Sequence, residues 1–305
     1  MANSEWTRAD TPDQSGRVAL VTGANSGLGF EVARALAENG ARVLLGCRNL
    51  DKAATAREAI LGSAADAEVE IVELDLASLD SVAEAAARVG ESDRNLDLLV
   101  NNAGVMAIPR TSTVDGFEMQ FGTNHLGHFA LTGRLLPTLL HTPGSRVVNV
   151  SSNGHRFGSM KFDNLMGEKR YSRWRQYSMT KLANLLFTYE LQSRLTHYDD
   201  TQPISVAAHP GVAHTGLGEQ AGHLMKVFGP LMAPMAQDAQ GGALPILRAA
   251  VDPTVMGDDY FGPSGRGETK GPPVKVESNK ASHDVAVATR LWKVSEDLTG
   301  VSYPF

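Results

Sequence analysis

A tyrosine and a lysine four residues apart, Tyr177 and Lys181 in the motif YSMTK, have the types and spacing needed for proton transfer. The pattern from Trp174 to Leu195 predicts a long helix, on which this spacing puts both side chains on one face. Free tyrosine has a pKa of about 10, too high for ready proton exchange near neutrality. Because a nearby cation favours the phenolate, we expect Lys181 to lower the pKa of Tyr177 and make it a general acid or base. Taken alone, the pair could equally be an ordinary contact on a helix surface.

Other polar residues stand at the ends of predicted strands. Ser151 and Ser152 follow the run RVVNV, where a hydroxyl group could stabilise charge on a reacting oxygen. The motif NNAG at Asn101 ends the preceding strand, and HPG at His209 ends the following one. Asn124 lies inside a predicted helix, where asparagine is unfavourable, and such exceptions are expected at functional sites. We therefore expect these residues to meet in one crevice at the edge of a sheet.

A glycine-rich turn, TGANSGLG from Thr22, lies between the first predicted strand and the first predicted helix. Backbone N–H groups and the helix dipole at such a place can hold a diphosphate. Gly23 and Gly27 would keep the turn tight and open to phosphates, and Gly29 would let the helix pack closely on the sheet. The spacing differs from the GxGxxG pattern, and a glycine turn can be purely structural. Its position after the first strand favours dinucleotide binding.

Arg48 follows the second predicted strand, at a place where a site for NAD usually has an acidic residue. A guanidinium group there would pair with a ribose 2′-phosphate, so we expect NADP(H) as the preferred cofactor, with NAD(H) possible. Arg48 could instead be a solvated surface residue. Arg42 lies at the wrong end of the same strand. Asp75, just after the third strand, could contact the adenine or merely cap the next helix.

The elements that would position these residues alternate short β-branched runs with longer helical patterns, which is typical of βαβ units. Predicted strands begin at Arg17, Ala41, Val69, Leu96, Arg146 and Ile204. Predicted helices include Gly27–Asn39, Trp174–Leu195, Asp238–Ala250 and Val285–Leu298, and the run GPSGRGETKGPP predicts a loop. We expect a single-domain α/β fold over residues 17–305, a doubly wound Rossmann fold whose mostly parallel sheet has helices on both faces, after a polar leader over residues 1–16.

Composition narrows the classes of function. With 305 residues, 42% of them hydrophobic, the chain can bury one large core. The net charge of -6 and the dispersed Lys and Arg residues argue against a nucleic-acid partner. The start of the sequence has no apolar run, and no stretch reaches the roughly 20 apolar residues of a membrane span, so we expect no integral membrane segment. The single cysteine, Cys47, fits a reducing compartment, and we expect a cytoplasmic protein.

Two histidines, His125 and His128, lie three residues apart on a predicted helix and resemble a pair of metal ligands. No nearby acid or further histidine completes a site. We therefore expect both side chains to pack against the following turns and predict no metal.

Together these residues resemble the short-chain dehydrogenase/reductase family, over nearly the whole chain from Arg17 onward. The resemblance rests on TGANSGLG, NNAG, Asn124, the paired serines, YSMTK and HPGVAHT, in that order. Longer runs, such as DGFEMQFGTNHLGHF and RLWKVSEDLTG, look like the retinol-dehydrogenase-like branch, which is similar in turn to light-dependent protochlorophyllide reductases.

That resemblance implies a catalytic tetrad of Asn124, Ser152, Tyr177 and Lys181. Tyr177 would exchange a proton with the substrate oxygen while Ser152 holds that oxygen. Ser151 would be the supporting neighbour of Ser152. Lys181 would lower the tyrosine pKa and bind the nicotinamide ribose, and Asn124 would hold a water that links Lys181 to solvent. The hydride would pass directly between the nicotinamide and carbon, with the protein supplying alignment and electrostatics.

The resemblance also implies an extended cofactor site. With the glycine turn and Arg48 included, the residues expected to contact the cofactor are Gly23, Asn25, Ser26, Gly27, Leu28, Gly29, Arg48, Asp75, Leu76, Asn102, Ala103, Gly104, Tyr177, Lys181, Pro210, Gly211, Val212 and Thr215. The Met-rich apolar segment 223–235 could form a substrate lid near residues 216–236, rest on a membrane, or complete a core. The long helices around Asn124 and Tyr177 often form subunit faces in this family, so a homodimer or homotetramer is expected.

The sequence thus predicts an NADP(H)-dependent oxidoreductase that transfers a hydride to or from a lipophilic alcohol or carbonyl compound. The alternative is a regulator that binds NADP(H) without turnover. An intact set of Asn124, Ser152, Tyr177 and Lys181 argues against that alternative, since a pure binder has no need of all four.

Overall fold

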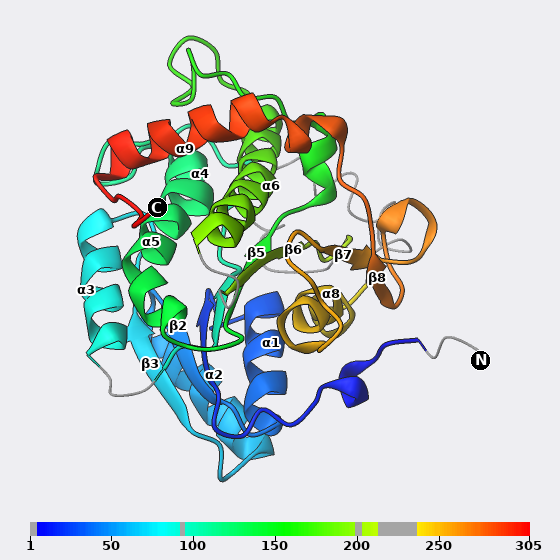
Figure 1. Ribbon diagram of the computed structural model, residues 1–305. Helices are drawn as coiled ribbons and strands as arrows, with labels where there is room; N and C mark the ends of the chain where they lie inside the picture. Colours follow the sequence, from blue (N-terminus) through cyan, green and yellow to red (C-terminus); the bar gives the residue numbers. More distant parts are fainter. Residues whose placement is uncertain (1–4, 92–94, 199–202, 213–236) are drawn as a thin grey trace.

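The computed structural model describes residues 5–91, 95–198, 203–212 and 237–305, whose strands form one sheet (Figure 1). Along the sheet the strand order is β3-β2-β1-β4-β5-β6-β7-β8, and the pairs are parallel except for β8, which runs antiparallel to β7. The strands are β1 (Val18–Thr22), β2 (Arg42–Cys47), β3 (Val69–Glu73), β4 (Leu98–Asn101), β5 (Arg146–Val150), β6 (Ile204–Ala208), β7 (Tyr260–Pro263) and β8 (Pro273–Lys275). The predicted doubly wound α/β fold is confirmed.

Helices cover both faces of this sheet (Figure 1). One face carries α1 (Gly27–Glu38), α2 (Leu50–Ser63) and α8 (Ala239–Val251). The other carries α3 (Leu79–Gly90), α5 (Gly127–Leu140) and α6 (Arg173–Tyr198). The short α4 (Met119–Phe121) leads through a π-helical turn, Gly122–Leu126, into α5, and α9 (Val285–Thr299) lies across the outside of α6. Short 3-10 turns complete the described elements: Arg8–Asp10, Asn153–Phe157, Arg266–Glu268 and Lys280–His283.

Alternation along the central strands explains the two helical layers. Ala19 and Val21 of β1 belong to the core beneath α1 and α8, whereas Val18 and Leu20 belong to the core beneath α3 and α5. All four are buried, as expected for a parallel sheet covered on both faces. Burial of each large apolar side chain contributes about 1.5–3 kcal/mol, so the hydrophobic runs of the sequence specify the centre of the sheet.

The predicted strands and helices are present, with ends that differ by up to three residues from those expected. The sequence did not predict β7 and β8, which include both ends of the run GPSGRGETKGPP that was expected to be loop throughout. Both strands are short, and Pro263 and Pro273 lie within them, so neither has the alternating pattern that identifies a strand. Their pairing nevertheless extends the sheet and fixes the loop between them.

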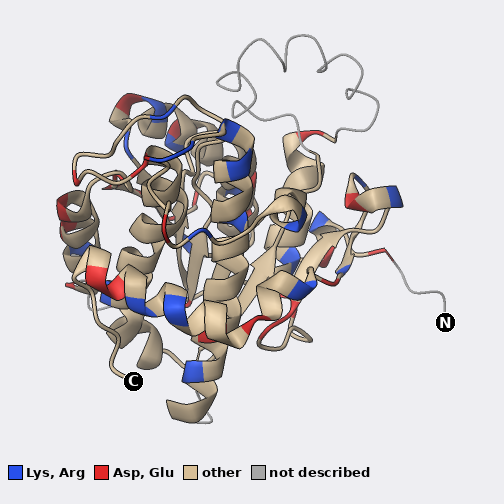
Figure 2. Ribbon diagram, turned by 90° about the horizontal axis from the view of Figure 1, so that it is seen from above, with Lys and Arg blue, Asp and Glu red and all other residues tan. Residues whose placement is uncertain are grey.

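The polar leader is bound to the domain where the structure describes it. Trp6 packs against the core, the backbone N–H of Gln14 donates to the Asn39 carbonyl at 2.7 Å, and Arg8 forms an ion pair with Glu38. Figure 2 shows Lys and Arg interspersed with Asp and Glu over the described elements. Among the helices of the described residues, none combines the length and apolarity that crossing a membrane takes.

Parts of the two helices expected to face other subunits, the middle of α6 and the side of α5 around Phe129, are covered inside this chain. The Trp292 ring of α9 packs on Phe129 and Phe187, with ring centres 5.2 and 5.8 Å apart. The Tyr303 hydroxyl donates to the Phe129 carbonyl at 2.8 Å, and every residue from Ser178 to Thr188 is buried. The middle of α6 therefore presents no side-chain surface to a second subunit, which gives no support to the expectation that α6 is a subunit face.

Candidate active site

The glycine turn joins β1 to α1 in the expected way. Gly23 and Gly27 have φ angles of 68° and 56°, in the left-handed region that favours glycine. A Cβ atom on Gly29 would lie 2.5 Å from both the Asn102 Nδ2 atom and the Gly23 carbonyl oxygen. The turn is therefore tight, and α1 packs directly against the neighbouring strand end.

The start of α1 is suited to a diphosphate. Ser26 is the N-cap residue, but its side chain makes no capping hydrogen bond. The first backbone bond of the helix runs from Phe30 to the Ser26 carbonyl, so the N–H groups of Gly27, Leu28 and Gly29 precede it. Asn25 is partly exposed and Ser26 exposed on the turn itself. Donors of this kind hold phosphate groups at other helix N-termini, so the residues present fit a dinucleotide.

Residues expected at the adenosine end lie together beyond β2 and β3. Arg48 directly follows β2 with 71% of its side chain exposed, and its Nη1 atom lies 3.7 Å from the Asp75 carboxylate. Leu76, the residue after Asp75, is buried. Asp75 accepts from the backbone N–H of Ala77, and Ser78 is the residue that caps α3, so the capping alternative for Asp75 is wrong.

Arg42 lies at the opposite end of β2, as expected. Its guanidinium group donates to the Glu70 carboxylate at 2.6 Å. Arg42 is therefore paired with Glu70 at the edge of the sheet opposite the glycine turn.

The NNAG motif connects β1 with the catalytic candidates. The backbone N–H groups of Asn102 and Ala103 both donate to the Thr22 hydroxyl oxygen at 3.0 Å, and Asn102 Nδ2 donates to the Thr22 carbonyl at 2.8 Å. A Cβ atom on Gly104 would lie 3.0 Å from Asn124 Oδ1 and 3.7 Å from Lys181 Nζ. Gly104 therefore lets the chain pass close to both of these side chains.

Asn124 lies in the π-helical turn between α4 and α5, a local irregularity that is frequent at functional sites. Its Oδ1 atom accepts from the Val105 N–H at 2.8 Å, and its Nδ2 atom donates to the Val105 carbonyl at 2.9 Å and to the Thr180 hydroxyl at 3.0 Å. The side chain is fully engaged in joining the segment after β4 to α6.

The two serines after β5 have different surroundings. The buried Ser151 hydroxyl donates to the Lys181 backbone carbonyl at 2.8 Å and so holds α6 in place. Ser152 is partly exposed, accepts from the Gly154 N–H at 3.1 Å, and forms a side-chain hydrogen bond with Tyr177. This arrangement agrees with Ser152 as the residue beside the reacting oxygen and Ser151 as its support.

Burial controls the protonation of Tyr177 and Lys181. It raises the pKa of Tyr177, and the hydrogen bond with Ser152 offsets only part of that effect. It also lowers the pKa of Lys181 to about 8. The ammonium group donates to the Val150 carbonyl at 2.9 Å and lies 5.9 Å from the centre of the Tyr177 ring. The expectation that Lys181 lowers the tyrosine pKa is therefore wrong for this structure, because burial outweighs any attraction between the two groups.

The structure thus brings Asn124, Ser152, Tyr177 and Lys181 to one edge of the sheet, and their catalytic roles stay predictions. Pro210, Gly211 and Val212 follow β6 at the same edge. Thr215 and the expected lid, residues 216–236 with the segment 223–235, lie outside the described residues.

The two histidines considered as metal ligands and the single cysteine are buried. His125 stacks on Phe121 and hydrogen-bonds Ser295, and burial lowers its pKa to about 3. His128 is also buried. Burial raises the pKa of the Cys47 thiol to about 11, which disfavours the reactive thiolate. In the part of the chain that the structure describes, no three His, Cys, Asp or Glu residues group as a metal site would require.

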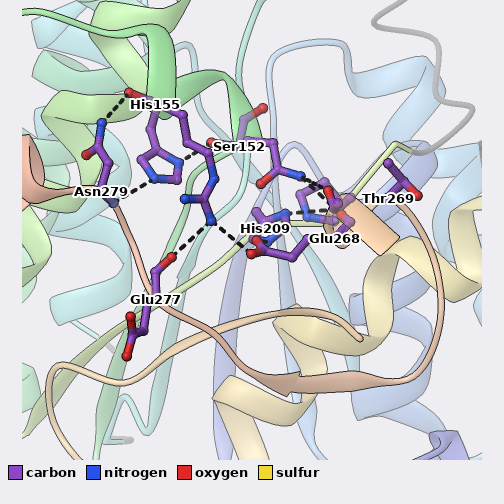
Figure 3. Close-up of polar contacts among 12 residues, drawn as sticks. Ser152, His155, His209, Glu268, Thr269, Glu277 and Asn279 are labelled. Atoms are coloured by element: carbon purple, nitrogen blue, oxygen red, sulfur yellow. Dashed lines mark hydrogen bonds and ion pairs between the residues drawn. The ribbon is translucent and has the colours of Figure 1, made fainter. Parts of the chain in front are cut away.

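Sequence reasoning missed the side chains that surround His209. Arg156, which lies after β5, forms an ion pair with Glu268 in the loop between β7 and β8. Glu268 in turn meets His209 after the carboxyl end of β6 (Figure 3). The one sequence signal is a glutamate and an arginine inside an otherwise Gly- and Pro-rich loop. Such residues are also common on exposed loops, so the pattern alone does not identify a site.

Known proteins resemble this chain along most of its length. A family model described as short chain dehydrogenase matches residues 17–224. Retinol dehydrogenase 11 of Mus musculus is 40% identical over 286 residues, which cover 94% of this chain and 87% of the mouse protein. A crystal structure of an uncharacterized protein from Mycobacterium paratuberculosis is 41% identical, with a TM-score of 0.83, and covers 99% of this chain and 100% of that one. A short chain dehydrogenase from Shigella flexneri complexed with NADP shares the fold at 22% identity and a TM-score of 0.64, with 82% and 97% of the two chains covered.

Proposed function

Since this chain belongs to the short-chain dehydrogenase family and is an oxidoreductase that acts on CH–OH groups, we propose that it transfers a hydride between NADP(H) and a lipophilic alcohol or carbonyl compound. The observation that carries this proposal is the meeting of Ser152, Tyr177 and Lys181 beside the glycine turn and the NNAG motif. Neither the site nor the relatives favour a regulator without turnover.

The preference for NADP(H) over NAD(H) rests on Arg48. Its exposed guanidinium group lies beyond β2 and beside Asp75, the residue expected at the adenine. A cation in this place would pair with a 2′-phosphate, whereas the acidic residue usual for NAD would repel it.

In the proposed mechanism, Tyr177 transfers the proton. Because its pKa is raised, the phenol keeps its proton near neutrality and can donate it to the oxygen of a carbonyl substrate. Ser152 holds that oxygen by a hydrogen bond as negative charge develops on it. The bound dinucleotide supplies the hydride.

Lys181 and Asn124 assist this proton transfer indirectly, by holding the cofactor and by positioning the chain. The Lys181 ammonium has N–H groups beyond the one that Val150 uses, and these would hold the nicotinamide ribose. With its pKa lowered to about 8, this group is still charged at neutral pH. The Asn124 side chain keeps the segment after β4 against α6 and so fixes the distance between the two halves of the site.

Exposed apolar side chains on α6 and on the turn after Ser152 support a lipophilic substrate. The Trp174 ring is 40% exposed and lies edge-on to the Tyr177 ring, with centres 6.4 Å apart. Phe157, in the turn after Ser152, is 83% exposed. The retinol dehydrogenases among the relatives are named for a lipophilic alcohol, so retinoids belong among the first substrates to test.

We also propose a cytoplasmic protein that forms a homodimer or homotetramer. The contacts between subunits would lie outside the face of α6 that α9 covers, because that face is already buried.

Incubation with NADPH and a panel of aldehydes and ketones tests the function. We expect NADPH absorbance to fall with lipophilic carbonyl compounds, retinaldehyde among them, and more slowly with small polar ones. Binding of NADPH without oxidation by any member of the panel, and without reduction of NADP by the matching alcohols, would contradict the enzyme and favour the regulator.

A further inference from the structure

The loop between β7 and β8 is bound to the ends of β5 and β6 by a glutamate at its centre. One Glu268 carboxylate oxygen accepts from His209 Nε2 at 2.9 Å, and the other accepts from Arg156 Nη2 at 2.8 Å. Arg156 also donates to the Glu277 carbonyl at 3.0 Å. Figure 3 shows Glu268, in the loop, pointing toward His209 at the end of β6. The carboxylate is thus shared between a histidine and an arginine.

The hydrogen bonds of His209 fix where its ring proton lies. The Gly211 N–H donates to His209 Nδ1 at 3.2 Å, so Nδ1 is an acceptor and carries no proton. The remaining ring proton is on Nε2, which donates it to Glu268. His209 is 0% exposed, so no solvent competes for either nitrogen. The ring therefore connects Glu268 to the backbone of the turn after β6.

A second contact joins the loop to the same turn. The Val212 N–H donates to the Thr269 carbonyl at 2.8 Å, and a Cβ atom on Gly211 would lie 2.3 Å from that oxygen. Asn153, the residue after Ser152, donates to the carbonyls of Gly267 and Glu268 at 3.2 and 3.1 Å. The loop thus bridges the segment beside Ser152 and the turn after β6.

The backbone at Glu268 is strained. Glu268 has a φ angle of 54° and follows Gly267 at 65°, so a glutamate occupies the left-handed region that side chains rarely adopt. Such a conformation persists only where its surroundings hold it. The contacts to His209, Arg156 and Asn153 supply that restraint.

We propose that Glu268 is a positioning residue for the nicotinamide half of the cofactor. It orients His209, and His209 and Thr269 together fix the backbone of residues 210–212, the turn that follows β6 at the catalytic edge of the sheet. The proposal rests on the proposed function and on the family resemblance, which puts residues 210–215 at the nicotinamide. Glu268 is far from the Arg48 end of the site in the strand order, so it acts on one half of the dinucleotide only.

Binding of two ligands separates this role from a general structural one. NADPH occupies the whole site, whereas 2′,5′-ADP contains only the adenosine and its phosphates. In Glu268→Ala we expect the Kd for NADPH to rise about tenfold or more, the loss typical of a hydrogen bond to a charged group, with 2′,5′-ADP binding within about twofold of the unchanged protein. Titration by protein and NADPH fluorescence, or by calorimetry, measures both constants.

Two further variants complete the test. Glu268→Gln keeps a carbonyl oxygen for the His209 proton and should recover most of the NADPH affinity that Glu268→Ala loses. Glu277→Gln is the matched control. Arg156 donates to the backbone carbonyl of Glu277, and the Glu277 side chain is exposed, so this change should leave the affinity for both ligands unaffected. Thermal melts establish that each variant is folded.

Each result has a distinct meaning. Equal losses for NADPH and 2′,5′-ADP, or no loss in Glu268→Ala, would overturn the positioning role while leaving the proposed function intact if the unchanged protein turns over. A selective loss of NADPH affinity in a protein that shows no turnover with any carbonyl compound would support the positioning role and overturn the proposed enzyme. An unchanged protein that binds neither ligand would overturn both.

Discussion

His128 donates a hydrogen bond from Nδ1 to the backbone carbonyl of Asn124, at 3.1 Å, inside the core. Since a carbonyl can only accept, Nδ1 carries the ring proton and Nε2 must accept from the Thr22 hydroxyl, which lies 2.9 Å away. The Thr22 oxygen in turn accepts from the N–H groups of Asn102 and Ala103. One neutral imidazole therefore connects the glycine turn, the NNAG motif and the candidate catalytic asparagine.

Removal of this imidazole should loosen both halves of the site. In His128→Phe the Asn124 carbonyl and the Thr22 hydroxyl each lose a partner in a buried place, and we expect the free energy of unfolding to fall by about 2–4 kcal/mol. Because Asn124 can then shift, kcat should fall by a larger factor than the factor by which the KM for NADPH rises. Denaturant unfolding and steady-state kinetics measure these effects.

His197→Phe provides the control for that variant, since it makes the same exchange on the exposed end of α6 and should change stability by less than about 0.5 kcal/mol. A His128→Phe protein with the stability and turnover of the unchanged protein would show that the connection has no energetic importance.

Stability should also fall in mild acid. Burial is the main cause that lowers the pKa of His128 to about 4, whereas an unfolded histidine titrates near 6.5. The folded state therefore binds its proton less readily than the unfolded state. The stabilising contribution is complete above about pH 6.5 and is lost as the pH falls toward 4, by roughly 3 kcal/mol over that window.

Thermal melts from neutral pH to pH 4 measure this effect. The decrease should be smaller in His128→Phe, which has one fewer group to protonate; His155, whose pKa burial also lowers to about 4, would account for part of the remainder. An identical pH dependence in the two proteins would rule out His128 as a source of acid sensitivity.

The parts of the fold that the sequence predicts are those with strong local patterns. Runs such as RVVNV are bounded by turn residues and buried on both faces, so Arg146–Val150 is found where expected. Because parallel strands end at one edge, the polar residues that follow them could be placed together before any geometry was known. The short strands Tyr260–Pro263 and Pro273–Lys275 have no such pattern and depend on their neighbours in the sheet.

Contacts between distant segments could not be predicted in the same way. Glu268 meets His209 and Arg156 only because β7 and β8 place their loop beyond β5 and β6. The prediction that the pKa of Tyr177 is lowered was wrong for a related reason. A spacing of four residues indicates that a cation is near, but the extent of burial, which decides the direction of the shift, depends on the whole fold.

Tyr177→Phe should separate binding from chemistry. The ring is kept, so the affinity for NADPH should stay within about threefold, while loss of the phenol proton should lower kcat by a factor on the order of 10² to 10⁴. Stopped-flow measurement of NADPH oxidation with an aldehyde that the unchanged protein reduces gives the rate of the chemical step. Trp174→Phe, next to the tyrosine on α6, is the matched control and should alter the KM for lipophilic substrates more than kcat. Unchanged turnover in Tyr177→Phe would show that Tyr177 is not the acid of the reaction.

Arg48→Ala should change the choice of cofactor. The Arg48 side chain is mostly exposed, and its ion pair with Asp75, at 3.7 Å, is a weak surface contact, so its removal should cost little stability. A lost ion pair with a 2′-phosphate, in contrast, should weaken NADPH binding by a factor on the order of 10 to 100 while NADH binding changes little. Titration of the variant and of the unchanged protein with both cofactors measures the ratio of the two Kd values. Arg42→Ala, at the opposite end of the same strand, should leave that ratio unaltered. If Arg48→Ala weakens both cofactors equally, Arg48 does not contact the 2′-phosphate, and the preference for NADP(H) loses its physical basis.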